Sequence, residues 1–161
     1  MLLGFSTWAM PDLPIDIVVS HLKAVGFDAV EIGVLPRFST SLDNLDGAER
    51  IRVASLIRDY SIKLSAVNAY TNLMEQDGAQ FADNVAYVKR AIELAEQWGE
   101  QSPQPTVISG FGGKPGDLDA HQNLLVDRLN ALGEFAESHG VIVALEHHVG
   151  NAVEMPDQVL S

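Results

Sequence analysis

The chain has 161 residues, of which 47% are hydrophobic, and its 22 acidic residues against 10 Lys plus Arg give a net charge of −12. The apolar content is enough to bury a core, which excludes a disordered acidic tail. The excess of acidic residues disfavours nucleic-acid binding, because neutralising phosphates requires a surface of Lys and Arg.

Short apolar runs alternate with longer stripes of helical spacing along the whole chain. Strands are predicted over residues 2–6, 29–32, 64–67, 106–109 and 141–145. Helices are predicted between them, with apolar stripes over residues 15–25, 47–60, 81–95 and 125–136. This order of elements predicts an α/β fold with parallel strands and right-handed crossovers.

The second of these helices has a recognisable beginning and a candidate buried face. Asp46 precedes it and is expected to cap its N-terminus. Ile51, Ala54 and Ile57 are expected to share the face that packs on the sheet.

A doubly wound open sheet is the alternative arrangement for five parallel strands. Such folds usually carry a glycine-rich phosphate fingerprint after the first strand, and no such pattern follows Ser6. The glycine cluster at 110–116 fails the P-loop pattern, because Pro115 stands where Ser or Thr should follow the lysine.

Polar or aromatic groups instead follow every predicted strand. They are Trp8, Glu31, Asn68 with Tyr70 and Asn72, Ser109 with Gly110, and Glu146 with His148. Groups at all strand ends are typical of a (β/α) barrel, whose strands converge on one mouth. Eight units take about 250 residues, so the sequence predicts a partial (β/α)8 TIM barrel with strands 1–5 and four crossover helices, the C-terminal units missing. Residues 155–161 look like the start of a further helix.

The fifth strand carries the sharpest functional signal. Side chains alternate along a strand, so Ile142, Ala144, Glu146 and His148 are expected on the face toward the barrel interior. A carboxylate and an imidazole two residues apart can face one divalent ion, or one can bind it while the other orients substrate. The alternative is a carboxylate paired with a neighbouring charge at a polar strand end.

The ends of the first three strands offer further candidates. Glu31 lies between two apolar residues, where it either faces the pocket or forms a salt bridge at its rim. Asn68 and Tyr70 share parity with Leu64 and Ala66, so an amide and a phenol are expected on one side. Trp8 is either a substrate-facing wall or an aromatic that caps the core. For Asn72, a role in turn formation is favoured.

Four segments together resemble the sugar phosphate isomerase/epimerase family. They are Gly4-Phe5-Ser6-Thr7, Ala29-Val30-Glu31-Ile32-Gly33, Asn68-Ala69-Tyr70-Thr71-Asn72-Leu73 and Val143-Ala144-Leu145-Glu146-His147-His148-Val149-Gly150. The resemblance runs through nearly all 161 residues. It implies a xylose-isomerase-like TIM barrel, a fold related to the endonuclease IV type of AP endonuclease, and residues 1–161 would be the N-terminal five-eighths of that single domain.

The resemblance also implies a divalent cation at the barrel mouth, with Mn, Mg, Co and Zn not distinguished. Glu146 matches the ligand that ends the fifth strand, and it is also expected to be one of two carboxylates that move a proton. His148 matches a histidine near substrate or metal, and Glu31 matches an acid of the second strand. Asn68 departs from the family, since many relatives have a histidine there.

The resulting hypothesis is an isomerase or epimerase of a small sugar or sugar phosphate. Proton abstraction next to a carbonyl would proceed through an enediolate, with the metal polarising the substrate oxygens. Substrate contacts are expected from Trp8, Glu31, Asn68, Tyr70 and His148. No nucleic-acid partner is expected, because the chain is acidic. No membrane partner is expected, because no apolar run approaches the roughly 20 residues that span a bilayer. A cytoplasmic location is expected, because the sequence has no cysteine and no signal peptide.

Two alternatives remain beside this hypothesis. The chain could be a non-catalytic fragment that holds a metal weakly and exposes the edges of its first and last strands, which invites pairing with another copy into a homo-oligomer. It could also be an AP-endonuclease-like phosphodiesterase, which the acidic charge and Asn68 disfavour.

Overall fold

Five parallel strands form one sheet in the order β1-β2-β3-β4-β5, in a computed structural model that describes residues 2–100, 102 and 104–158. The strands are β1 (Gly4–Ser6), β2 (Ala29–Gly33), β3 (Lys63–Asn68), β4 (Thr106–Gly110) and β5 (Ile142–Glu146). A doubly wound sheet reverses its strand order at a switch point. The strictly sequential order is that of a barrel wall, so the expected partial TIM barrel is confirmed.

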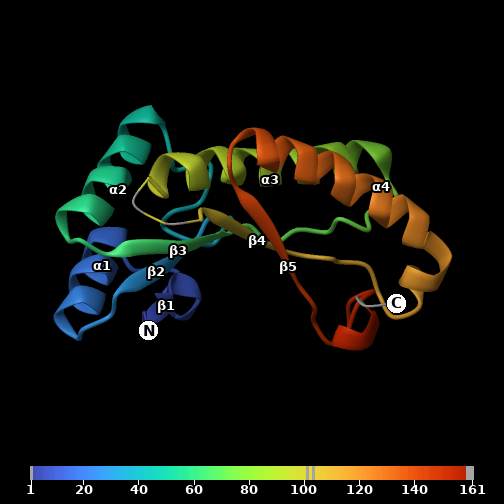
Figure 1. The fold of residues 1–161 in the computed structure, drawn as a ribbon, viewed down its shortest axis with the longest axis horizontal. Helices are drawn as coiled ribbons and strands as arrows, with labels where there is room; N and C mark the ends of the chain where they lie inside the picture. The colour runs from blue at the N-terminus through green and yellow to red at the C-terminus, as the bar shows by residue number, and fades with distance from the viewer. Residues whose placement is uncertain (1, 101, 103, 159–161) are drawn as a thin grey trace.

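Four helices connect the strands. They are α1 (Ile15–Ala24), α2 (Gly47–Asp59), α3 (Gly78–Trp98) and α4 (Asp117–Ser138). Each helix contacts the next along the chain, and α3 and α4 run side by side along the sheet (Figure 1). Within the described residues, no helix is long and apolar enough to cross a membrane.

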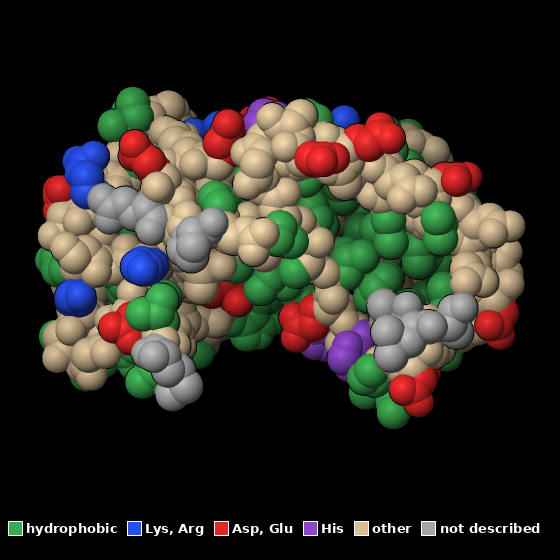
Figure 2. All heavy atoms as spheres, viewed as in Figure 1, with side chains coloured by type: hydrophobic (Ala, Val, Ile, Leu, Met, Phe, Trp, Pro, Cys, Tyr) green, Lys and Arg blue, Asp and Glu red, His purple; other side chains and the backbone are tan. Residues whose placement is uncertain are grey.

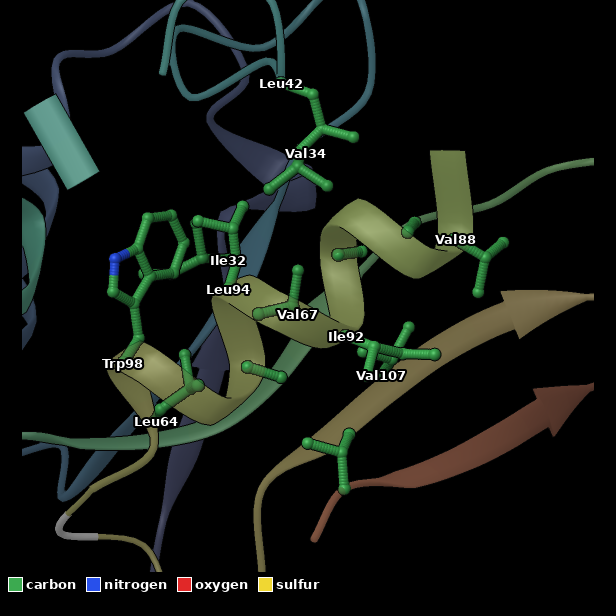
Figure 3. Packing of buried hydrophobic residues seen from close by; sticks show 14 of the residues in the cluster. Ile32, Val34, Leu42, Leu64, Val67, Val88, Ile92, Leu94, Trp98 and Val107 are labelled. Atoms are coloured by element: carbon green, nitrogen blue, oxygen red, sulfur yellow. The ribbon is translucent and has the colours of Figure 1, made fainter. Parts of the chain in front are cut away.

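The core lies between the helices and one face of the sheet. Ile92 and Leu94 of α3 are fully buried, as are Val67 of β3 and Val107 of β4. Figure 3 shows these side chains meeting where α3 crosses the two strands. Side chains on the opposite face of the strands therefore turn away from this core.

The element bounds agree with the sequence prediction to within two residues for the strands. The Asp46 side chain accepts a hydrogen bond from the Glu49 amide at 2.8 Å, which confirms the predicted cap of α2. Two short 3-10 turns were not predicted, η1 (Thr7–Ala9) and η2 (Pro156–Gln158). The turn η2 occupies part of the segment expected to open a further helix, and residues 159–161 of that segment lie outside the described part.

The predicted buried face of α2 is wrong at one position. Ile51 is 62% exposed, whereas Val53 and Ile57 are buried. Six residues at roughly 100° each place Ile51 and Ile57 about 120° apart around the helix. Val53 and Ile57 are four residues apart, so they share the face that packs.

The expected parity along β3 is wrong for Leu64, because the pairing of β2 with β3 contains an irregularity, whereas Asn68 and Tyr70 line the same cavity as expected. Val30 pairs with Leu64, but the next residue, Glu31, pairs with Ala66. The extra residue in β3 reverses the alternation, as a β-bulge does. Leu64 consequently packs in the helix-side core (Figure 3), whereas Asn68 contacts Glu31.

A matched pair of substitutions tests the packing of α2. We expect Ile57→Ala to lower the free energy of unfolding by about 2–5 kcal/mol, because it leaves a cavity in the core. Ile51→Ala makes the same chemical change at an exposed position and should alter it by no more than about 0.5 kcal/mol. Urea unfolding followed by circular dichroism measures both values, and equal losses would contradict the assigned face.

The pH dependence of stability tests the environment of Tyr87 on α3. Its hydroxyl is buried without a hydrogen-bond partner among the described residues, and burial raises the pKa of Tyr87 from 10.0 to about 12. A raised folded-state pKa contributes stability below pH 10 that is lost as the pH rises toward 12. Tyr87→Phe should therefore lose less stability than the wild type over this interval.

The control for this experiment is Tyr60→Phe, at a position that is 38% exposed. It should keep the wild-type pH dependence. Urea unfolding at successive pH values distinguishes the two variants. A wild-type decline in the Tyr87→Phe variant would show that the Tyr87 hydroxyl is not held in an apolar environment.

Candidate functional site

A cavity of about 340 Å³ opens at the carboxyl-terminal ends of the strands. It is lined by Ser6, Trp8, Glu31, Asn68, Tyr70, Glu146 and His148. All the side chains singled out in the sequence as candidate site residues therefore come together here. Figure 2 shows acidic and histidine side chains beside the indentation along the lower edge of the molecule.

A larger cavity, of about 450 Å³, lies elsewhere, between α4 and β5. Most of its lining is apolar, including Leu129, Leu132, Val143 and Leu145. Figure 2 shows a hydrophobic hollow on this side of the molecule. Converging polar groups are what mark a binding site for a polar ligand, so the smaller cavity is the stronger candidate.

Glu31 is held at one side of the smaller cavity by two hydrogen bonds to a single oxygen. Ser6 Oγ donates to Glu31 Oε1 at 2.6 Å, and Asn68 Nδ2 donates to the same atom at 3.1 Å. Glu31 forms no ion pair with any described residue, so the structure shows the pocket-facing arrangement and not a salt bridge at the rim. Asn68 is 5% exposed, and its Oδ1 has no hydrogen-bond partner in the described part of the chain.

Ser6 is the lining residue that the sequence reasoning missed. It is the last residue of β1 and pairs directly with Glu31 across the sheet. Its position at a strand end was the available signal, but its partner becomes evident only once the register of β1 against β2 is known.

Glu146 lies between two groups at the other side of the cavity. The Tyr70 hydroxyl donates to Glu146 Oε2, and His148 Nε2 lies 4.0 Å from Glu146 Oε1. Burial raises the pKa of the Tyr70 phenol, and the hydrogen bond to Glu146 raises it further. The phenol therefore stays protonated and acts as a hydrogen-bond donor that orients the carboxylate.

The rings of three lining residues, Trp8, Tyr70 and His148, contact one another and form one wall of the cavity. The Trp8 and Tyr70 rings lie 5.9 Å apart, and the Tyr70 and His148 rings lie 5.4 Å apart. Trp8 is 45% exposed, so it is a wall of the cavity and does not cap the core. The cavity thus combines an apolar face with carboxylate, amide and imidazole groups.

Asn72 supports the loop that follows β4. Its Oδ1 accepts hydrogen bonds from the amides of Met74 and Gly113, both at 3.0 Å. This confirms the expected role of Asn72 in a turn, and the glycine-rich segment packs on it.

The donors in the described residues fit a metal site only in part. Glu146 and His148 present two suitable donor groups to the cavity. The structure shows, within its described ranges, no group of three or more His, Cys, Asp or Glu side chains placed to hold an ion. Hard divalent cations take about six donors, so these residues can provide part of a ligand set and not all of it.

A sequential parallel sheet with a polar cavity at its carboxyl ends is the arrangement of TIM-barrel proteins. The comparison with known families agrees with this class. The chain belongs to the xylose isomerase-like TIM barrel family, whose model matches residues 19–160.

A curated relative is the inosose dehydratase of Salmonella typhimurium. It is 25% identical over 143 residues, which cover 88% of this chain and 46% of the relative. The chain therefore spans about half the length of this relative.

Solved structures share the fold at lower identity. D-psicose 3-epimerase from Clostridium cellulolyticum, solved with D-tagatose, has a TM-score of 0.78 and 16% identity over 99% of this chain and 59% of its own. A xylose isomerase-like TIM barrel protein from Mycobacterium smegmatis, solved with magnesium, has a TM-score of 0.69 and 17% identity over 99% of this chain and 58% of its own. Such similarities show the fold.

Substitution of Gly110 by alanine tests the placement of the Tyr70 ring. A Cβ atom at Gly110 would lie 2.7 Å from Tyr70 Cε1, so Gly110→Ala should displace the ring and break its hydrogen bond to Glu146. We expect the free energy of unfolding to fall by about 1–3 kcal/mol and the NMR signals of the Tyr70 ring to shift.

Gly133→Ala is the matched control on α4, where an added Cβ meets nothing within 4 Å. It should leave the Tyr70 signals in place and keep or raise the stability, because alanine favours a helix. Unchanged Tyr70 signals in the Gly110→Ala protein would contradict the close packing of this ring.

Proposed function

We propose that the protein is a divalent-metal-dependent isomerase or epimerase of a small sugar or sugar phosphate. The observation that carries the proposal is the convergence of Glu31, Glu146 and His148 on one cavity at the carboxyl ends of the strands. Membership of the xylose isomerase-like family and an epimerase among the structural relatives support it. The reaction would be proton transfer next to a carbonyl, through an enediolate.

The proposal applies to a complete barrel. We propose that residues 1–161 are its N-terminal five-eighths, a single domain whose remaining strands supply the rest of the site. The roughly twofold greater length of the curated relative supports this organisation. The two donor groups of the described residues also fit it, because a complete ligand set needs more.

Glu146 and His148 are the residues of this chain that would hold the cation, which is Mn, Mg, Co or Zn. A bound divalent ion polarises the oxygens of a substrate carbonyl and hydroxyl. Tyr70 is a positioning residue in this scheme, because its hydroxyl binds Glu146 Oε2. That contact leaves Oε1, the atom on the His148 side, for the cation.

The remaining lining residues suit a carbohydrate. Glu31, oriented by Ser6 and Asn68, would accept a hydrogen bond from a sugar hydroxyl. Trp8 offers an aromatic face to the apolar side of a sugar ring or chain. Glu146 would be one of the two carboxylates that transfer the proton.

A non-catalytic role is the second candidate for the 161 residues taken alone. The observation that favours it is the incomplete ligand set among the described residues. Such a chain would bind a divalent ion weakly and would turn over no substrate.

Glu146→Gln in the whole protein tests the proposal. We expect metal affinity and turnover each to fall by about 100-fold or more, because a neutral amide replaces the carboxylate that binds the ion and moves the proton. Calorimetric titration with Mn²⁺ gives the affinity, and conversion of a panel of ketoses and their phosphates gives the turnover.

The matched control is Glu134→Gln, which removes the same charge at an exposed position on α4. It should behave as the wild type in both measurements. If Glu146→Gln also kept wild-type metal affinity and turnover, Glu146 would not be the ligand and the proposed site would be wrong.

A further inference from the structure

The loop between β2 and α2 is tied firmly to the end of the barrel wall. Thr40 Oγ1 donates to the Gly33 carbonyl at 2.6 Å, and the Leu42 amide donates to the Val34 carbonyl at 3.1 Å. Ser39 binds the preceding loop through its amide and its hydroxyl. Residues 35–39 are therefore presented by a rigid support and not by a free loop.

Phe38 fixes the conformation of this loop. Its ring is buried, 3% exposed, and it lies so close to Gly33 that a Cβ atom there would be 2.6 Å from Phe38 Cε1. The ring also contacts Trp8, with centroids 5.9 Å apart. Phe38 thus connects the loop to the aromatic wall of the cavity.

Arg37, the residue before Phe38, lies on this wall. Its guanidinium carbon is 4.5 Å from the centroid of the Trp8 ring and 5.2 Å from that of Phe38. Arg37 is exposed, and no described carboxylate forms an ion pair with it. Stacking on aromatic faces uses the plane of a guanidinium and leaves its N–H donors available in the fork that binds phosphate or carboxylate.

Arg37 carries a charge opposite to that of the carboxylates that line the cavity. The lining contains the carboxylates Glu31 and Glu146 and no Lys or Arg. An anionic group of a ligand would be repelled beside these carboxylates, and it would be attracted to a cation at the rim. Arg37 supplies such a cation next to Trp8, which is itself part of the lining.

We propose that Arg37 binds an anionic substituent of the substrate, a phosphate or a carboxylate, at the rim of the cavity. The inference rests on the proposed function, since it concerns the substrate of the same site. It narrows the substrate class to sugars that carry a negative charge at the end remote from the reacting carbons.

Three ligands that differ only at one carbon test this inference by calorimetric titration of the whole protein. D-glucose is neutral, D-glucose 6-phosphate carries a phosphate and D-glucuronate carries a carboxylate. At low salt, we expect the wild type to bind at least one of the two anionic ligands about tenfold or more tightly than D-glucose. The preference should decrease as NaCl is added.

Arg37→Gln should abolish this preference and leave the affinity for D-glucose unchanged. Arg58→Gln is the matched control, because it removes the same charge from an exposed position at the end of α2 and should keep the preference. If D-glucose 6-phosphate binds more tightly than D-glucuronate, the substituent is a phosphate. The opposite order of affinities would identify a carboxylate.

The inference is overturned if neither anionic ligand binds more tightly than D-glucose, or if the preference survives in Arg37→Gln. Its failure is distinct from failure of the proposed function. Loss of the anion preference concerns binding alone, whereas the proposed reaction depends on the metal affinity and turnover measured with Glu146→Gln.

Discussion

Burial of one face of the parallel sheet under the helices is the constraint on which the rest of the structure depends. Val67 and Val107 must face α3 to be removed from water, and alternation then directs their neighbours to the opposite face. Parallel pairing brings the carboxyl ends of all strands to one edge. Glu31 and Glu146, from strands far apart in sequence, therefore share one cavity.

The irregularity between β2 and β3 modifies this constraint at one position. With unbroken alternation, Leu64 and Asn68 would lie on the same face, and burial of Leu64 in the helix-side core would take Asn68 with it. The extra residue between Leu64 and Ala66 separates the two. Leu64 packs in the core, and Asn68 reaches Glu31. One bulge thus serves the core and the cavity together.

The fold and all the lining residues of the cavity except Ser6 were predictable from sequence, because they follow from local patterns. The Asp46 cap and the polar groups at strand ends such as Glu146 are visible without knowledge of contacts. Pairings between distant residues were not predictable. The Ser6–Glu31 hydrogen bond needs the register of two strands, and the choice between Ile51 and Val53 needs the rotation of α2 about its axis.

The net charge of −12 has different consequences at different distances from the cavity. Across the whole surface it opposes binding of an extended polyanion, whose many phosphates need many cations. A single anionic group needs only one well-placed partner, and Arg37 is held beside the cavity by Trp8 and Phe38. If Arg37 binds an anionic substituent as proposed, the charge pattern would also orient the ligand, because the carboxylates Glu31 and Glu146 line the cavity and the guanidinium lies next to Trp8. The hydroxyl groups of the ligand would then point inward and its anionic end outward, so an acidic protein would select a small anionic substrate.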